Sequence, residues 1–253
     1  MQIYLAGALW VAGAAAVGAL LAWAVRRFGL DEGRPDNNEA TGQVFVIVSG
    51  LHAVIVGFVL ISLFDAVSTT SDGLDAEAEG LVAASWAADS LPGQTGAEVR
   101  SLGDSYARNV VDYEWPQLHA GQDVTGPGWQ QLDAIRGAIA ASEPVGEWQE
   151  DRKTEAFSRL WEVYHERQAR LAAVEDNQVA EVVWFVLIIG TVVTVLLPNL
   201  FGGTKLWPQV VLMSTLAGAL TLLLFAIYQL QNPFNGTSAI QPDALEWAMG
   251  RLT

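Results

Sequence analysis

The sequence predicts an all-α polytopic membrane protein with four transmembrane helices and a helical soluble insert between helices two and three. Three observations predict this class: four uncharged apolar runs, an acidic segment between the second and third run, and no apolar/polar alternation long enough for a β-strand. The 253-residue chain has a formal net charge of −15, which argues against a nucleic-acid partner because phosphate backbones attract basic proteins. It contains no cysteine, which excludes disulfides, thiol catalysis and cysteine-ligated metals.

Each apolar run is expected to form one transmembrane helix. About 20 residues at ~1.5 Å per residue cross the ~30 Å of hydrocarbon in a bilayer. The third run is the shortest, and it reaches that length only if its helix begins before Glu181. The four runs cover residues 3–25, 44–64, 182–197 and 206–230.

The first run is interpreted as a retained anchor. A secretory signal peptide carries basic residues before its apolar run, and here no basic residue precedes Ile3. Ala14, Gly18 and Ala22 recur every four positions, which allows the backbone of a neighbouring helix to approach closely. An Ala-rich helix without such a neighbour would show the same pattern.

The insert, residues 67–178, is expected to be soluble. It holds 8 Lys+Arg against 20 Asp+Glu, a net charge of −12. Apolar residues recur in it at helical spacing, as at Val99, Leu102 and Tyr106. The predicted segments are therefore 1–66 with transmembrane helices one and two, 67–178 as the acidic helical domain, 179–230 with helices three and four, and 231–253 as the C-terminal tail.

Basic residues in the short loops predict the orientation. Arg26, Arg27 and Arg34 lie between the first two runs, and Lys205 lies between the last two. Since short loops rich in Lys and Arg stay in the cytoplasm, the acidic domain is expected on the extracytoplasmic side of the cell membrane.

The order of the apolar runs and the insert, together with four short motifs, resembles a bacterial membrane-protein family known as bestrophin-like. The motifs are Asp-Ala-Glu-Ala-Glu at 75–79, Tyr-Glu-Trp-Pro at 113–116, Pro-Phe-Asn-Gly at 233–236, and the Asn-Asn-Glu entry to the second run at 37–39. The resemblance covers nearly the whole chain. It implies kinship with bestrophins, which are oligomeric ion channels, typically pentamers, whose second span lines the pore. It also implies a cytoplasmic helical region, opposite to the orientation that the basic residues predict.

The second run carries the candidate pore residues. His52 lies at its middle, where an ionisable side chain is costly and is by default a functional candidate. One hypothesis is a pore or proton-sensitive position with an apolar constriction at Val56 or Val59 that gates by dewetting. The other is a neutral histidine hydrogen-bonded to an adjacent helix. The predicted pore-lining residues are Phe45, Ser49, His52, Val56, Val59 and Leu63.

Carboxylates follow the second run and predict an acidic vestibule. In a symmetric ring, Asp65, Asp72 and Asp75 would repeat around the axis and concentrate cations. For Glu77 and Glu79 the sequence favours a simpler expectation, solvated side chains in the first turns of the domain.

No metal, cofactor or catalytic site is predicted. Asp75, Glu77 and Glu79 have the spacing of a calcium loop, but position twelve, which needs a carboxylate, is Trp86. Glu162 and His165 form one Glu-x-x-His step, whereas a di-iron bundle needs two such steps. Phosphate-binding, dinucleotide-binding and nucleophile-elbow motifs are absent from the sequence.

Two functional hypotheses follow. The first is a homo-oligomeric ion channel, pentameric by resemblance, whose partners are the lipid bilayer and inorganic ions and whose acidic vestibule predicts cation preference. The second is a membrane-anchored interaction or sensing module whose helical domain binds a protein. Tryptophans on that domain fit the second hypothesis: Trp86, Trp115, Trp129, Trp148 and Trp161.

Overall fold

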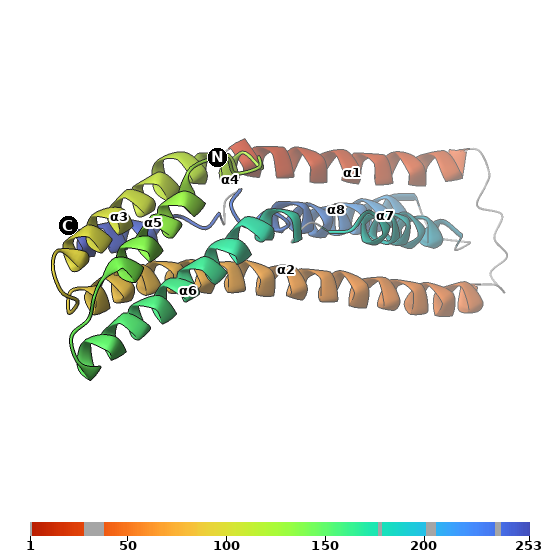
Figure 1. Ribbon diagram of the computed structural model, residues 1–253. Coiled ribbons are helices and arrows are strands. Elements are labelled where there is room, and N and C mark those ends of the chain that lie inside the picture. The colour runs from red at the N-terminus through yellow and green to blue at the C-terminus, as the bar shows by residue number, and fades with distance from the viewer. Residues whose placement is uncertain (1, 28–37, 177–178, 201–205, 236–238) are drawn as a thin grey trace. The chain divides into compact units, whose positions relative to one another are not determined.

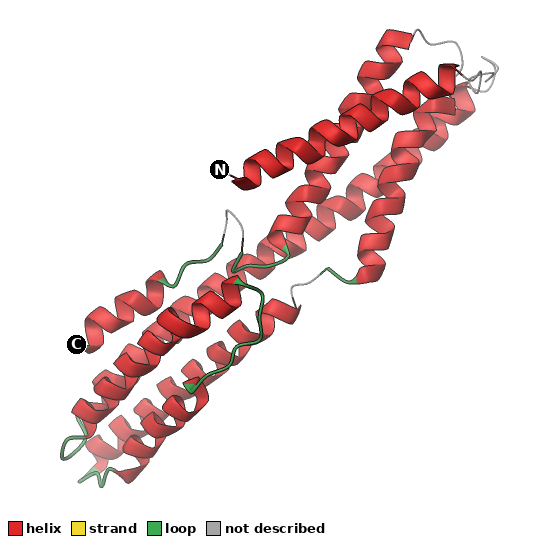
Figure 2. Ribbon diagram, turned by 90° about the horizontal axis from the view of Figure 1, so that it is seen from above, coloured by secondary structure: helices red, strands yellow, loops and turns green. Residues whose placement is uncertain are grey.

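The computed structural model describes residues 2–27, 38–176, 179–200, 206–235 and 239–253. The chain forms two compact units, one from the described residues of Met1–Phe64 and Val179–Gln231, the other from those of Asp65–Gln178 and Asn232–Thr253. Helices make up both units, and Figure 2 shows no strand in the described residues. The division of the chain into the four domains expected from the sequence stays a prediction.

The first unit holds the apolar helices (Figure 1). Three helices are long and apolar enough to cross a membrane, which confirms the all-α polytopic membrane fold. The fourth, α7, begins at Glu181 itself and has 16 residues, so it rises only about 24 Å, and the count of four spans stays a prediction. The elements are α1 (Gln2–Arg27), α2 (Asn38–Ala88, which continues into the second unit), α7 (Glu181–Leu196), the 3₁₀ turn η3 (Leu197–Leu200) and α8 (Leu206–Leu230).

Close packing of α1 on α8 confirms the small-residue prediction. A Cβ at Gly18 would lie 2.8 Å from the backbone oxygen of Met213, and Ala22 is fully buried beside Met213 and Ala217. The other faces of these helices leave large apolar side chains such as Leu9 exposed. Such extensive apolar surface suits lipid or further copies of the chain.

The second unit is a helical domain with its own apolar core. Fully buried core side chains include Tyr106, Leu132 and Ile139. The Pro92-Gly93 turn ends α2, and Gly93 has a φ of +74°, a conformation that only glycine adopts readily. Besides the end of α2, the elements are α3 (Thr95–Asn109), the π-helical turn η2 (Val110–Glu114), α4 (Trp115–His119), α5 (Gly128–Ala141), α6 (Glu147–Asp176) and α9 (Asp243–Leu252).

The C-terminal segment is part of this second core. Phe234 is 1% exposed, and its ring meets the ring of Trp115 edge to face at 5.3 Å. His119 Nδ1 lies 2.7 Å from the Phe234 carbonyl oxygen. Because a carbonyl oxygen only accepts, Nδ1 carries the proton in this contact. The contact therefore ties the chain after α8 to α4.

Candidate functional site

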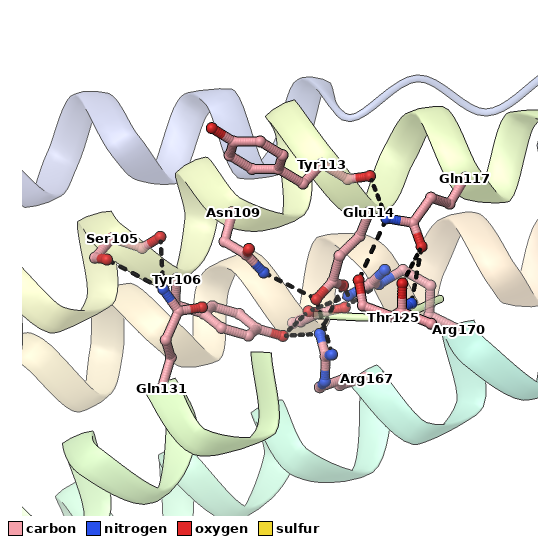
Figure 3. Close-up of polar contacts among 11 residues, drawn as sticks. Ser105, Tyr106, Asn109, Tyr113, Glu114, Gln117, Thr125, Gln131, Arg167 and Arg170 are labelled. Carbon is pink, nitrogen blue, oxygen red and sulfur yellow. Dashed lines mark hydrogen bonds and ion pairs between the residues drawn. The ribbon is translucent and has the colours of Figure 1, made fainter. Parts of the chain in front are cut away.

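A cluster of buried charged side chains lies at the centre of the second unit (Figure 3). Its members come from three separate parts of the chain: α2, the contiguous elements α3 and η2, and α6. None is more than 6% exposed, and two carboxylates balance two guanidinium groups. The cluster consists of Glu77 from α2, Tyr106 and Asn109 from α3, Glu114 from η2, and Arg167 and Arg170 from α6.

Glu114 is the most connected carboxylate. Arg167 donates to both of its oxygens, Nη1 to Oε2 at 2.8 Å and Nη2 to Oε1 at 2.9 Å. Arg170 Nη2 donates to Oε2 at 3.3 Å, and Asn109 Nδ2 to Oε1 at 2.9 Å. Figure 3 shows these groups converging on the carboxylate. Such charge-assisted, bidentate hydrogen bonds are the strong ones in proteins.

Arg170 joins the second carboxylate to the first. Its Nε donates to Glu77 Oε2 at 2.8 Å and its Nη2 to Glu77 Oε1 at 3.1 Å. The Tyr106 hydroxyl also donates to Glu77 Oε1. One guanidinium group therefore holds carboxylates from α2 and η2 together.

The pKa shifts follow from this pairing. Burial alone would raise the pKa of the Glu114 carboxyl, but hydrogen bonds from Arg167 and the charges of Arg170 and Arg167 hold it below its ordinary value. Burial would lower the pKa of Arg170, and the charge of Glu77 outweighs burial and raises it. The pKa of Tyr106 is raised by burial and by the adjacent Glu77 charge. The cluster is thus stable as two ion pairs with a neutral phenol.

The start of α5 is shaped to fit this cluster. A Cβ at Gly128 would lie 2.5 Å from both Arg167 Cζ and Glu114 Oε1, so no side chain fits there. The next residue, Trp129, places its ring 4.8 Å from Arg167 Cζ, a cation–π contact. The π-helical turn η2, which lies between α3 and α4 and ends at Glu114, is a local widening of that helix next to the cluster.

Sequence reasoning missed this cluster. The expectation that Glu77 is solvated is wrong, because Glu77 is fully buried against Arg170, whereas Glu79 is exposed as expected. The signal in the sequence that could have revealed the cluster was the helical register of residues along α6. Arg167 and Arg170 continue the buried stripe of α6 through Leu160 and Val163, as a charged pair inside a core helix would.

Three of the motifs that suggested the family meet in this unit. The Asp-Ala-Glu-Ala-Glu motif supplies Glu77, Tyr-Glu-Trp-Pro supplies Glu114 and Trp115, and Pro-Phe-Asn-Gly supplies Phe234. Glu77 and Glu114 share Arg170, and Trp115 contacts Phe234. These short motifs therefore serve one packed centre rather than separate sites.

A second candidate site lies inside the first unit. His52 is 4% exposed, and its Nε2 lies 3.1 Å from Thr191 Oγ1 on α7. Its Nδ1 has no hydrogen-bond partner. A Cβ at Gly190 would lie 2.8 Å from His52 Cε1 and closer still to Nδ1, so the ring fits against α7 only because residue 190 is glycine.

The predicted pore residues share the buried side of α2. His52, Val56 and Leu63 are at most 5% exposed, and Val56 and Leu63 pack with Leu187 of α7 and Ile227 of α8. Phe45, Ser49 and Val59 are partly buried, and Ser49 Oγ donates to the Phe45 carbonyl oxygen at 2.6 Å. In the protomer His52, Val56, Val59 and Leu63 therefore face its own helices. The pore role of all six residues stays a prediction.

The predicted vestibule residues lie elsewhere on α2. Asp65, Asp72 and Asp75 are all exposed. They belong to the second unit, whereas the six pore candidates belong to the first. The described residues contain no group of three His, Cys, Asp or Glu that could hold a metal ion.

Comparison with known proteins identifies one family. A family model described as "Bestrophin-like domain" matches residues 12–245, a range that includes the charge cluster and His52. No curated protein and no solved structure matches the chain. The family match suggests a membrane protein of the ion-channel kind rather than an enzyme.

Proposed function

Because the chain belongs to the bestrophin-like family, we propose that several copies of it assemble into an ion channel in a lipid bilayer, with α2 bordering the conduit. The observation that carries this proposal is the exposure of α2. Only 11% of its most apolar 18-residue stretch is buried in the protomer. An uncovered apolar helix needs lipid or another copy beside it. A ring of copies, five by resemblance to bestrophins, would cover it.

The exposed stripe of α2 is the face that best suits a conduit between copies. Gly50 and Gly57 are seven positions apart, and a Cβ at either would meet nothing within 4 Å. Beyond the apolar run, Asp65 and Asp72 of the same helix are exposed. The His52 stripe faces α7 instead, so the predicted pore residues would conduct only through a pathway inside the protomer.

We further propose that the channel prefers cations. Asp65, Asp72 and Asp75 are exposed on one stripe, and the 67–178 segment carries a net charge of −12. Repeated around a ring, these carboxylates would concentrate cations at the mouth and repel anions.

Reversal potentials test this proposal. The purified protein is placed in planar bilayers with asymmetric KCl, and the reversal potential is expected near the potassium equilibrium potential. The triple variant Asp65→Asn, Asp72→Asn, Asp75→Asn should shift it toward the chloride potential. A matched control, Glu143→Gln, Glu147→Gln, Glu150→Gln, changes the charge equally at exposed positions outside the stripe and should leave it unchanged. Absence of conductance would contradict the channel, and a chloride reversal in the unmodified protein would contradict cation preference.

Cysteine substitution distinguishes the two faces of α2, because the chain has no native cysteine. Gly57→Cys, at a half-buried position where a Cβ meets nothing within 4 Å, should be blocked by a charged thiol reagent, whereas the adjacent Val56→Cys on the buried stripe should not. Block at Val56 alone would place the conduit inside the protomer, along the predicted pore residues.

Exposed tryptophans favour one alternative function, a membrane-anchored interaction module. Trp86, Trp148 and Trp161 are 59%, 62% and 73% exposed. Trp115 is unavailable to a partner because it is 7% exposed, whereas Trp129, whose ring lies over Arg167, is 37% exposed. Stoichiometry separates the two functions, since a monomer or dimer in detergent favours the module and a larger ring favours the channel.

A further inference from the structure

We propose that His52 is a proton-binding site that holds α2 against α7 while it is neutral and releases α7 when it is protonated. The contact is polar on one side of the ring only. Nε2 lies 3.1 Å from Thr191 Oγ1, whereas Nδ1 has no partner and lies against Gly190. A neutral imidazole has one donor and one acceptor nitrogen. The contact therefore fits the tautomer in which Nε2 donates to Thr191 and Nδ1 is bare.

Protonation is incompatible with this packing. It adds a hydrogen to Nδ1, and that hydrogen would point at the Gly190 backbone, where the structure gives it no acceptor. It also adds a charge to a side chain that is 4% exposed within an apolar bundle. A buried charge without a partner is costly, so the protonated ring should leave its place on α7.

The described part of this unit offers no compensating charge. The only ionisable residue of α7, Glu181, is nine positions before Gly190, and α8 contains no Asp, Glu, Lys, Arg or His. On α2 itself, Glu39 and Asp65 are each thirteen positions from His52, about 20 Å along the helix. Tyr4 of α1 and Tyr228 of α8 are 70% and 60% exposed, and the arginines of α1 are its last two residues.

A distance measurement across the two helices tests the proposal. Phe58→Cys on α2 and Phe185→Cys on α7 replace exposed side chains in a chain that has no other cysteine. Spin labels are attached at pH 8, and the full-length labelled chain is diluted with unlabelled chain so that pairs between copies vanish. On moving to pH 5 the distance is expected to lengthen by about 2 Å, the size of common helix shifts.

Variants assign the response to His52. His52→Gln keeps an amide donor for Thr191 but does not titrate, so the distance should be the same at both pH values. The double variant His119→Gln, His165→Gln removes the two other histidines of the chain and should keep the lengthening. Gly190→Ala should give the longer distance already at pH 8, because its Cβ occupies the place of the ring.

Equal distances at pH 8 and pH 5 in the histidine-containing chain would overturn the proposal. The same lengthening in His52→Gln would overturn it as well, since the proton would then bind elsewhere. Neither measurement requires ion conduction, so this inference and the proposed channel can fail independently.

Discussion

Replacing Glu114 by glutamine tests how far the buried cluster stabilises the second unit. The carboxylate accepts two hydrogen bonds from Arg167 and one each from Arg170 and Asn109. In Glu114→Gln, Glu77 alone would face two guanidinium groups, and the amide nitrogen would point a donor at other donors. Removing one partner of a buried ion pair costs about 3–5 kcal/mol, which corresponds to a fall in melting temperature of roughly 10 °C for a domain of this size.

The assay is a thermal melt of the full-length protein in detergent, followed by tryptophan fluorescence, because Trp129 lies against Arg167. Glu79→Gln is the matched control, since Glu79 is exposed on the same helix as Glu77. In the Glu114→Gln background, Arg167→Met should cost less than it does alone, because it removes the uncompensated charge. If Glu114→Gln melts at the temperature of Glu79→Gln, the cluster does not hold the unit together and the reasoning fails.

Three further predictions use the same protein. Gly128→Ala should lower the melting temperature because its Cβ meets Arg167 and Glu114, whereas Gly137→Ala on the same helix α5, where nothing lies within 4 Å, should stabilise by about 0.5–1 kcal/mol. The pKa of Glu114 is lower in the folded than in the unfolded chain. Its contribution to folding stability is therefore present above the unfolded pKa of 4.5 and is lost as the pH falls from that value through the lower folded pKa. If the melting temperature of the unmodified protein falls no more steeply below pH 4.5 than that of Glu114→Gln, this expectation is wrong. Gln122→Cys, at an exposed position, should react with an impermeant thiol reagent in intact cells if the acidic domain is extracytoplasmic, as the short-loop arginines predict, and protection would support the bestrophin orientation.

The membrane fold could be predicted from the sequence because hydrocarbon imposes a strong rule on it. A run of about 20 uncharged residues has few alternatives to a membrane helix. The small residues Gly18 and Ala22 likewise indicated that a neighbouring helix could approach closely, because close backbone approach requires small side chains, but only the structure identifies that helix as α8. The length of α7 was less predictable, since its N-terminal end at Glu181 is not marked by the apolar pattern alone.

The charge cluster could not be predicted because its partners are far apart in sequence. Glu77 and Arg170 are 93 positions apart and Glu114 and Arg167 are 53 positions apart. Glu77 and Glu114 alone are typical of a solvated helix face, and the register of Arg167 and Arg170 indicates that they are buried but not which carboxylates they pair with. Only the fold shows that opposite charges from α2, η2 and α6 meet, and that burial makes the pairing obligatory.

The position of Phe234 in the core has a consequence for how the chain is made. The second unit needs residues 232–253, which leave the ribosome after the last apolar helix. At about 5–20 residues per second, synthesis from Gln178 to Phe234 takes roughly 3–11 s. During that time Trp115 lacks its ring partner. The nascent domain cannot complete its core until both remaining apolar helices have been synthesised, and until then its exposed apolar surface is prone to aggregation.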